Sequence, residues 1–253
     1  MDGIVLEPGE GESLFGGRIV LKATFPQLCI TESFFPDARD GAGPHIHHHH
    51  ADSFFIVAGG FAVLVHDREH VLDPGACVCA PPEVVHGFRT TSASRFLNFH
   101  TPDGGFADNL RARNRGEEGG FDSVDVEPGS GREPTDAVLL APREGELLTG
   151  PHRVATIKVA REEIAMIEFE LEPGFEGPDP HAHDDHIDSF YVLDGEVTFL
   201  MDGETVQLGA GSFVAAPLGV EHAFSNPGPG RARVLNIHAP SVGFHDRLRD
   251  FRT

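Results

Sequence analysis

Two segments of the chain carry the same histidine-rich pattern, and this internal repeat constrains the fold more than any other feature. Residues 44–59 read PHIHHHHADSFFIVAG and residues 180–195 read PHAHDDHIDSFYVLDG, so half of the aligned positions are identical. Each copy places a His-x-His pair a few residues before an aspartate, and this combination of donors suits a metal ion. The repeat therefore predicts two related modules, each with a site of its own.

The repeat extends over nearly the whole chain. The aligned ranges are 4–16 with 138–150, 22–90 with 158–226, and 97–111 with 235–249. Between the copies, residues 116–136 are rich in Gly, Glu and Asp, which is typical of an exposed linker. We therefore predict an N-terminal domain over 1–115, a linker over 116–136 and a C-terminal domain over 137–253.

Each copy consists of short apolar runs separated by turns. Runs rich in branched residues alternate with polar positions, and Asp-Gly pairs at 194–195 and 202–203 are typical of hairpin turns. The 30 glycines and 19 prolines also favour an all-β barrel or jelly roll over a helical fold. Short helices over 105–114 and 243–251 are expected to close the two copies.

The charge of the chain excludes several classes of partner. Asp and Glu number 40 against 19 Lys and Arg, and the formal net charge of -21 repels phosphate backbones and anionic lipid surfaces. The first residues lack the basic and apolar regions of a signal peptide, and no apolar stretch reaches membrane-spanning length. We therefore expect a cytoplasmic protein that binds neither nucleic acid nor membrane.

Several histidines of each copy are expected to converge. In a strand, side chains two residues apart lie on the same face, so each His-x-His pair presents both rings together. A further histidine follows much later in each copy, at His86 and at His222. Histidines and a carboxylate that meet inside a barrel form a site for a divalent transition metal, with positions left open for substrate or oxygen.

The spacing of these residues resembles that of the bicupins, which are proteins of the cupin superfamily with two barrels in one chain. The first cupin motif ends with a Glu and a Gly separated by six residues, and here Asp188 stands at the Glu position and Gly195 at the Gly position. The second motif is complete in the second copy, at Gly211, Pro217, Gly219, His222 and Asn226. The first copy departs from it at Glu83 and Thr90, where the motif has Gly and Asn.

This resemblance implies two tandem cupin jelly-roll barrels, each with a divalent transition metal (Fe, Mn, Ni, Co, Cu or Zn). The implied ligands are His45, His47, Asp52 and His86 in the first barrel, and His181, His183, Asp188 and His222 in the second. Because aspartate is one methylene shorter than glutamate, His50 and His186 remain alternative fourth ligands. The same two histidines are the candidate catalytic bases.

Other residues are also paired between the copies. The aromatic residues expected to line the barrel interiors are Phe54, Phe88, Phe190 and Phe224. His100 and His238 are expected near the barrel mouths, either supporting the ligands or in a structural role. Arg95 and Arg233 are expected to form ion pairs. His48 and His49 have no histidine counterparts, so we expect them to face solvent.

The chain is similar to the quercetin dioxygenase-like bicupins, and this implies a dioxygenase that acts on an enolisable or phenolic small molecule. Dioxygen would then be its second substrate. Two alternatives remain open: an oxygen-independent, metal-dependent isomerase or decarboxylase, and a non-enzymatic cupin that binds a small molecule. Because two barrels in one chain can bury one another, the protein is expected as a monomer or a homodimer.

Overall fold

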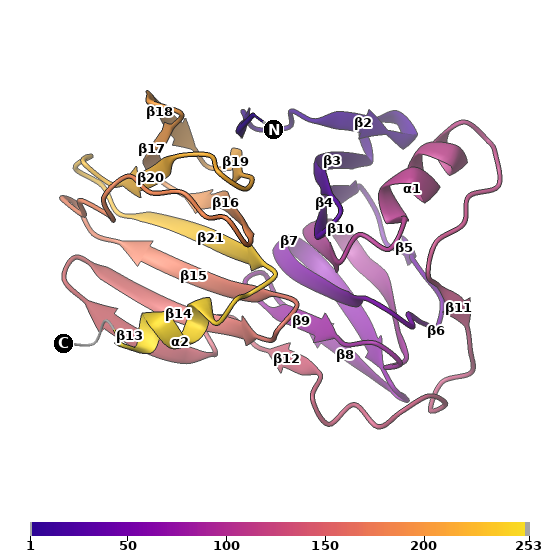
Figure 1. Cartoon of the computed structure of the whole chain (residues 1–253). Helices are drawn as coiled ribbons and strands as arrows, with labels where there is room; N and C mark the ends of the chain where they lie inside the picture. The colour runs from indigo at the N-terminus through magenta and orange to yellow at the C-terminus, as the bar shows by residue number, and fades with distance from the viewer. Residues whose placement is uncertain (1, 251–253) are drawn as a thin grey trace. The chain divides into compact units, whose positions relative to one another are not determined.

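The computed structural model describes residues 2–250, which fold into β-strands and two short α-helices (Figure 1). The predicted all-β class is therefore confirmed. The helices expected near the end of each repeat are α1, Phe106–Asn114, and α2, Phe244–Asp250. Residue 251, the last of the helix predicted over 243–251, lies outside the described part. No helix in residues 2–250 combines the length and apolarity that crossing a membrane requires.

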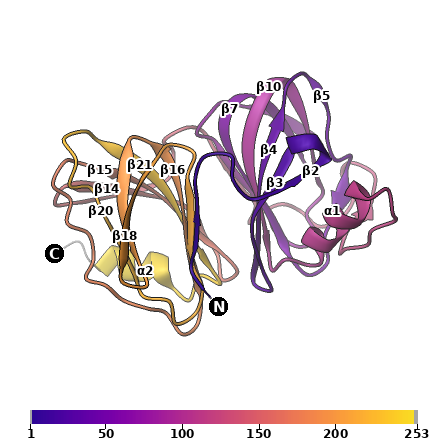
Figure 2. The ribbon, with the colours of Figure 1, turned by 90° about the horizontal axis from the view of Figure 1, so that it is seen from above.

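Contacts divide the chain into two compact units. The N-terminal unit comprises Gly11–Glu144, and its main sheet has the strand order β12-β9-β7-β10-β4-β3-β2. Figure 2 shows these strands curving around a common interior. The strands of this unit are β2 (Glu12–Leu14), β3 (Ile19–Phe25), β4 (Leu28–Phe35), β5 (Arg39–Asp40), β6 (His45–Ile46), β7 (Ala51–Val65), β8 (Arg68–Leu72), β9 (Cys77–Ala80), β10 (His86–Thr101), β11 (Val124–Asp125) and β12 (Val138–Leu140).

The C-terminal unit combines the residues up to Glu10 with those from Gly145 onward. One sheet has the order β1-β19-β16-β21-β15-β14-β13, and a second sheet has the order β18-β17-β20. Its strands are β1 (Ile4–Leu6), β13 (Glu146–Gly150), β14 (Arg153–Ala160), β15 (Ala165–Leu171), β16 (Ile187–Asp194), β17 (Glu196–Met201), β18 (Glu204–Gly209), β19 (Phe213–Ala216), β20 (His222–Ser225) and β21 (Ala232–Ala239). The strands of each unit enclose an apolar core of buried side chains.

Two short strands join the unit that their position in the repeat would not suggest. Strand β1 opens the first copy but pairs with β19 of the C-terminal unit, with Val5 opposite Val214. Strand β12 opens the second copy but pairs with β9 of the N-terminal unit, with Leu139 opposite Val78. The boundaries 1–115, 116–136 and 137–253 therefore describe the sequence repeat, whereas the contacts group the chain differently.

Aromatic side chains fill the interior of each unit. Phe54 packs on Phe61, Phe88 and Phe96 in the N-terminal unit, with ring centroids 5.4 to 6.2 Å apart. Phe190 contacts Phe199 and Phe224 in the C-terminal unit at 5.4 and 5.0 Å. The prediction that the paired phenylalanines line the interiors is confirmed. Burying such rings supplies much of the hydrophobic free energy of folding.

The paired arginines form ion pairs across neighbouring strands, as predicted. Arg95 on β10 binds Glu32 on β4, and Arg233 on β21 binds Glu168 on β15. Each glutamate also forms an ion pair with a buried lysine: Glu32 with Lys22 at 2.8 Å and Glu168 with Lys158 at 3.4 Å. A buried carboxylate is tolerated only when it is paired in this way.

The exchanged strand β12 is expected to contribute to the stability of the N-terminal unit. Leu139 is partly buried against the apolar core of that unit, so Leu139→Asp should lower its free energy of unfolding by about 1–3 kcal/mol. Hydrogen exchange of the β9 amides should accelerate. Val71→Asp in the same unit is the control, because Val71 is 71% exposed. Unchanged β9 protection in the Leu139 variant would contradict the pairing.

Candidate metal centres

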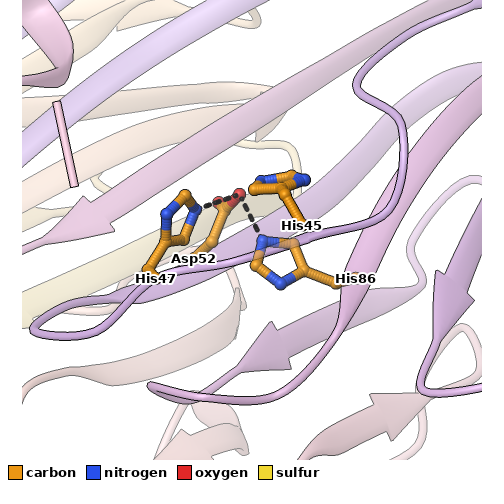
Figure 3. Close-up of side chains that lie close together, drawn as sticks. All are labelled: His45, His47, Asp52 and His86. Atoms are coloured by element: carbon orange, nitrogen blue, oxygen red, sulfur yellow. Dashed lines mark hydrogen bonds and ion pairs between the residues drawn. The ribbon is translucent and has the colours of Figure 1, made fainter. Parts of the chain in front are cut away.

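The four predicted ligands of the N-terminal unit lie together (Figure 3). His45 on β6 pairs directly with His86 at the start of β10, and Asp52 lies near the start of β7. His47 follows β6 by one residue. One donor atom from each of the four side chains lies within 4.8 Å of the others. The strands thus bring residues from both cupin motifs to one place.

The C-terminal unit repeats this arrangement. The backbones of His181 and His222 exchange two hydrogen bonds, of 3.1 and 2.8 Å, which align the two motifs. His183 follows His181, and Asp188 lies near the start of β16. The donor atoms of these four residues also lie within 4.8 Å of one another.

Backbone carbonyls orient the imidazole rings. The Nδ1 atom of His86 lies 2.9 Å from the carbonyl of Val84, and that of His222 lies 3.0 Å from the carbonyl of Val220. A carbonyl only accepts hydrogen bonds, so Nδ1 must carry the proton and donate it. His45 and His181 make the same contact to the carbonyl two residues earlier. The Nε2 atom of each ring therefore faces the centre of its cluster with its lone pair available to a metal ion.

The shorter carboxylate still reaches its cluster. Asp188 Oδ2 lies 3.1 Å from His222 Nε2 and 3.8 Å from His183 Nε2. Asp52 Oδ2 lies 3.3 Å from His86 Nε2 and 3.8 Å from His47 Nε2. Such separations are those of neighbouring ligands around one ion, because metal to ligand distances are about 2.0–2.2 Å. The aspartate is therefore placed to complete each set.

An asparagine, on β10 in the N-terminal unit and on β21 in the C-terminal unit, binds the other carboxylate oxygen. The side-chain amide of Asn98 donates to Asp52 Oδ1, and that of Asn236 donates to Asp188 Oδ1. These asparagines in turn accept hydrogen bonds from His100 and His238, at 3.0 and 2.9 Å. The contact leaves Oδ2 facing the histidines. The supporting role expected for His100 and His238 rests on this chain of bonds.

The donor set fits a divalent transition metal. Three imidazole nitrogens and one carboxylate oxygen suit such ions. In addition, His47 Nε2 and His183 Nε2 are buried and have no hydrogen-bond partner in the described structure. A buried polar atom without a partner is unfavourable, and coordination would satisfy it.

The electrostatics also favour a ligand role. Burial lowers the pKa of His45 to about 4 and lowers that of His181, so both rings are neutral near pH 7. Burial alone would raise the pKa of Asp188, but the neighbouring His238 and the hydrogen bond with His222 hold it well below its ordinary value. Burial opposes the charge on His222, yet the Asp188 carboxylate raises its pKa. Neutral imidazoles and an ionised carboxylate are the forms that bind metals.

The predicted bases lie beside the four-ligand sets. His50 stacks on His47, and His186 contacts His183, with ring centroids 3.9 Å apart in both units. Neither is a member of the four-ligand sets; each belongs to a second group, with His100 or His238. Their role in proton transfer stays a prediction.

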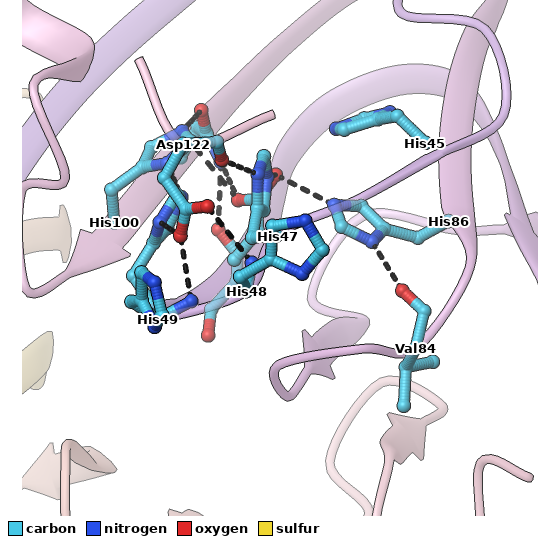
Figure 4. Close-up of polar contacts among 12 residues, drawn as sticks. His45, His47, His48, His49, Val84, His86, His100 and Asp122 are labelled. Atoms are coloured by element: carbon cyan, nitrogen blue, oxygen red, sulfur yellow. Dashed lines mark hydrogen bonds and ion pairs between the residues drawn. The ribbon is translucent and has the colours of Figure 1, made fainter. Parts of the chain in front are cut away.

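A segment expected to be a linker contacts the N-terminal cluster (Figure 4). The Asp122 carboxylate accepts hydrogen bonds from the backbone N–H groups of His48 and His49, at 3.0 and 2.6 Å, and contacts His50 Nδ1 at 3.0 Å. His47 Nδ1 donates to the Asp122 carbonyl at 2.5 Å. The side chains of His48 and His49 are exposed, as predicted. No sequence signal identifies Asp122, because its segment lies outside the repeat.

Access differs between the two clusters. The C-terminal ligands His181, His183 and Asp188 line a cavity of about 490 Å³. Its other lining residues include four aromatic and two basic side chains: Phe169, Phe175, Phe224, Phe244, Arg153 and Arg247. The side chain of His183 is 14% exposed, whereas that of His47 is 1% exposed. His186 is not among the residues that line this cavity.

The family model described as a cupin domain matches residues 35–100 and 167–238. Quercetin 2,3-dioxygenase of Bacillus subtilis (strain 168) is 34% identical over 94 residues, which cover 35% of this chain but only 28% of that enzyme. Protein Ylba from E. coli superposes with a TM-score of 0.68 at 10% identity, covering 94% and 90% of the two chains. A point mutant of salicylate 1,2-dioxygenase from Pseudoaminobacter salicylatoxidans gives 0.60 at 14% identity, covering 88% and 73%. The structural matches establish a shared fold.

Removing the amide that holds Asp188 should weaken metal binding in the C-terminal unit. Asn236→Ala leaves Asp188 Oδ1 without its side-chain donor, and changes to groups behind the ligands weaken metal affinity by about 10–100-fold. Equilibrium dialysis with Mn²⁺ measures the effect. Asn226→Ala is the control, because the Asn226 amide binds the backbone carbonyls of Leu171, Glu172 and Gly230. Equal affinity in both variants would contradict the role of Asn236.

Proposed function

Because the chain belongs to the cupin family, with a cupin domain in each half, we propose that it is a metal-dependent dioxygenase acting on an enolisable or phenolic small molecule. The observation that carries the proposal is the C-terminal cluster, where four side chains able to bind a metal ion meet and three of them line an aromatic cavity. The similarity of part of the chain to quercetin 2,3-dioxygenase supports the same reaction class. We place catalysis in the C-terminal unit for these reasons.

The ligands of this unit would be His181, His183, Asp188 and His222. A divalent ion held there would act as a Lewis acid that lowers the pKa of an enol or phenol and orients its oxygen. Asp188 stays ionised and supplies negative charge, and the carbonyl contacts fix the histidine rings. The surrounding phenylalanines would bury the substrate ring and exclude water.

Two arginines suit an anionic substrate. Arg153 at the start of β14 and Arg247 in α2 both line the cavity, and neither adjoins a ligand in the sequence. Burial lowers the pKa of Arg153, so its charge lies in a partly desolvated place. Arg247 lies 5.9 Å from the centre of the Phe244 ring. A guanidinium in such a place binds carboxylate or phenolate oxygens through charge-assisted hydrogen bonds.

Oxygen uptake tests the reaction. The chain loaded with Fe²⁺, Mn²⁺ or Ni²⁺ should consume dioxygen with flavonols or other enolisable substrates. His181→Ala removes a ligand of the open cluster and should abolish uptake, whereas His45→Ala in the closed cluster should leave most of it. Elemental analysis of both variants reports which unit has lost its ion. No uptake across the substrate panel by the metal-loaded chain would refute the dioxygenase.

Arg153 should determine affinity for the substrate. Arg153→Gln removes the charge, and the hydrogen bond of a charged group contributes about 1.5–3 kcal/mol, so KM for an anionic substrate should rise about tenfold or more. Arg231→Gln is the control, because Arg231 is exposed and pairs with Glu172 at 2.8 Å. An unchanged KM in the Arg153 variant would argue against an anionic substrate.

The same two arginines also favour a second candidate, an oxygen-independent decarboxylase that acts on a small carboxylic acid. A divalent ion held by these ligands would then bind the substrate carboxylate, and no dioxygen would be consumed. Turnover of a panel of small carboxylic acids under strict anaerobiosis, followed as release of carbon dioxide, separates this candidate from the dioxygenase. Tight binding without turnover under either condition would indicate a non-enzymatic binding protein.

A further inference from the structure

Three histidines of the C-terminal unit each have a buried ring nitrogen without a hydrogen-bond partner. These atoms are Nε2 of His183, Nε2 of His186 and Nδ1 of His238. The other nitrogens of two of these rings are engaged: His186 Nδ1 lies 2.7 Å from Asp185 Oδ1, and His238 Nε2 donates to Asn236 Oδ1 at 2.9 Å. These bonds fix the rings of His186 and His238, and the unpaired nitrogen of each ring lies on the side opposite to its bond.

The three rings also lie close together. One donor atom from each lies within 4.8 Å of the other two. The ring centroids of His183 and His186 are 3.9 Å apart, and those of His186 and His238 are 4.9 Å apart. His186 and His238 are both 0% exposed. Buried imidazoles that converge in this way are the donors that Zn²⁺, Cu²⁺, Ni²⁺ and Co²⁺ prefer.

We propose that the C-terminal unit has a second cation position, formed by His183, His186 and His238, beside the four-ligand set. His183 belongs to both sets, and its buried Nε2 atom can bind only one ion at a time. The two positions therefore exclude one another. The set with Asp188 suits Mn²⁺ and Fe²⁺, whereas the three-histidine set suits Zn²⁺ and Cu²⁺. This inference goes beyond the proposed function, because it concerns where an ion binds and not what is turned over.

The N-terminal unit supplies a matched comparison. His47, His50 and His100 occupy the equivalent places. There, His50 Nε2 and His100 Nδ1 lie 2.9 Å apart and bond to each other, and His50 Nδ1 contacts Asp122. Only His47 Nε2 of this group is without a partner in the described structure. In the N-terminal group His50 and His100 are thus already bonded, and an ion would have to break these contacts to bind all three rings.

Equilibrium dialysis with Zn²⁺ and electron paramagnetic resonance with Cu²⁺ test the second position. The full chain with His45→Ala and His47→Ala serves as background, so that binding reports the C-terminal unit. Adding His181→Ala and His222→Ala removes two ligands that belong only to the four-ligand set. This chain should still bind one Zn²⁺ ion, and its Cu²⁺ spectrum should show coupling to three nitrogens.

Adding His238→Ala should then weaken Zn²⁺ binding by about 100-fold or more, because even changes behind a ligand weaken metal affinity by about 10–100-fold. Loss of Zn²⁺ binding in the His181→Ala and His222→Ala chain, with its circular dichroism unchanged, would overturn the proposal. An unchanged affinity after His238→Ala would overturn it as well. Should the combined variant not fold, His222→Gln alone in the same background carries the same test.

The mirror variants provide the control. In a His181→Ala and His183→Ala background, adding His45→Ala and His86→Ala leaves only the N-terminal group of three histidines. This chain should bind Zn²⁺ at least about tenfold more weakly than its C-terminal counterpart, because its rings are already bonded. Equal affinity in the two units would overturn the role assigned to the unpaired nitrogens.

Discussion

Each unit is organised around one buried aspartate whose two oxygens have different partners. In the C-terminal unit, Asp188 Oδ1 accepts the Asn236 amide, and Oδ2 faces His222 and His183. A carboxylate at 3% exposure is costly unless it is paired, and these bonds connect β16 with β21 of the same sheet and with β20 of the other sheet. Asp52 has the same contacts in the N-terminal unit. In each unit the histidines of the cluster lie around the second oxygen of this aspartate.

The two units place the same ligands in different surroundings. Residues 116–136 follow only the first copy, and Asp122 from this segment caps the backbone and ring of the histidine run. In the second copy the exposed side chain of Asp185 contacts the ring of His186, the next residue in the chain, instead. The result is one closed cluster and one that opens on a cavity. The two copies therefore share the same candidate ligands but differ in the accessibility of these side chains.

The sequence predicted the ligands better than their surroundings. All eight residues converge in two groups of four, because motif spacing fixes which strand ends carry donors. The Asp in place of Glu left the fourth ligand open, and the distances place that carboxylate within each set. Arg153 and Arg247 were not predicted, because they reach the cavity from β14 and α2, far from either motif. The alternation of apolar and polar residues along a strand does not predict which distant side chains line the same cavity.

The repeat, the all-β class and the residues able to bind a metal can all be read from the amino-acid sequence. Those properties depend on local spacing: alternation sets the face of a strand, and a donor type sets its chemistry. Only the tertiary structure decided which strands exchange between the units, which cluster is accessible, and which ring nitrogens stay unpaired. These outcomes depend on contacts between residues distant in the chain, such as His47 with Asp122 and Asp188 with Asn236. Such contacts exist only after the sheets have closed.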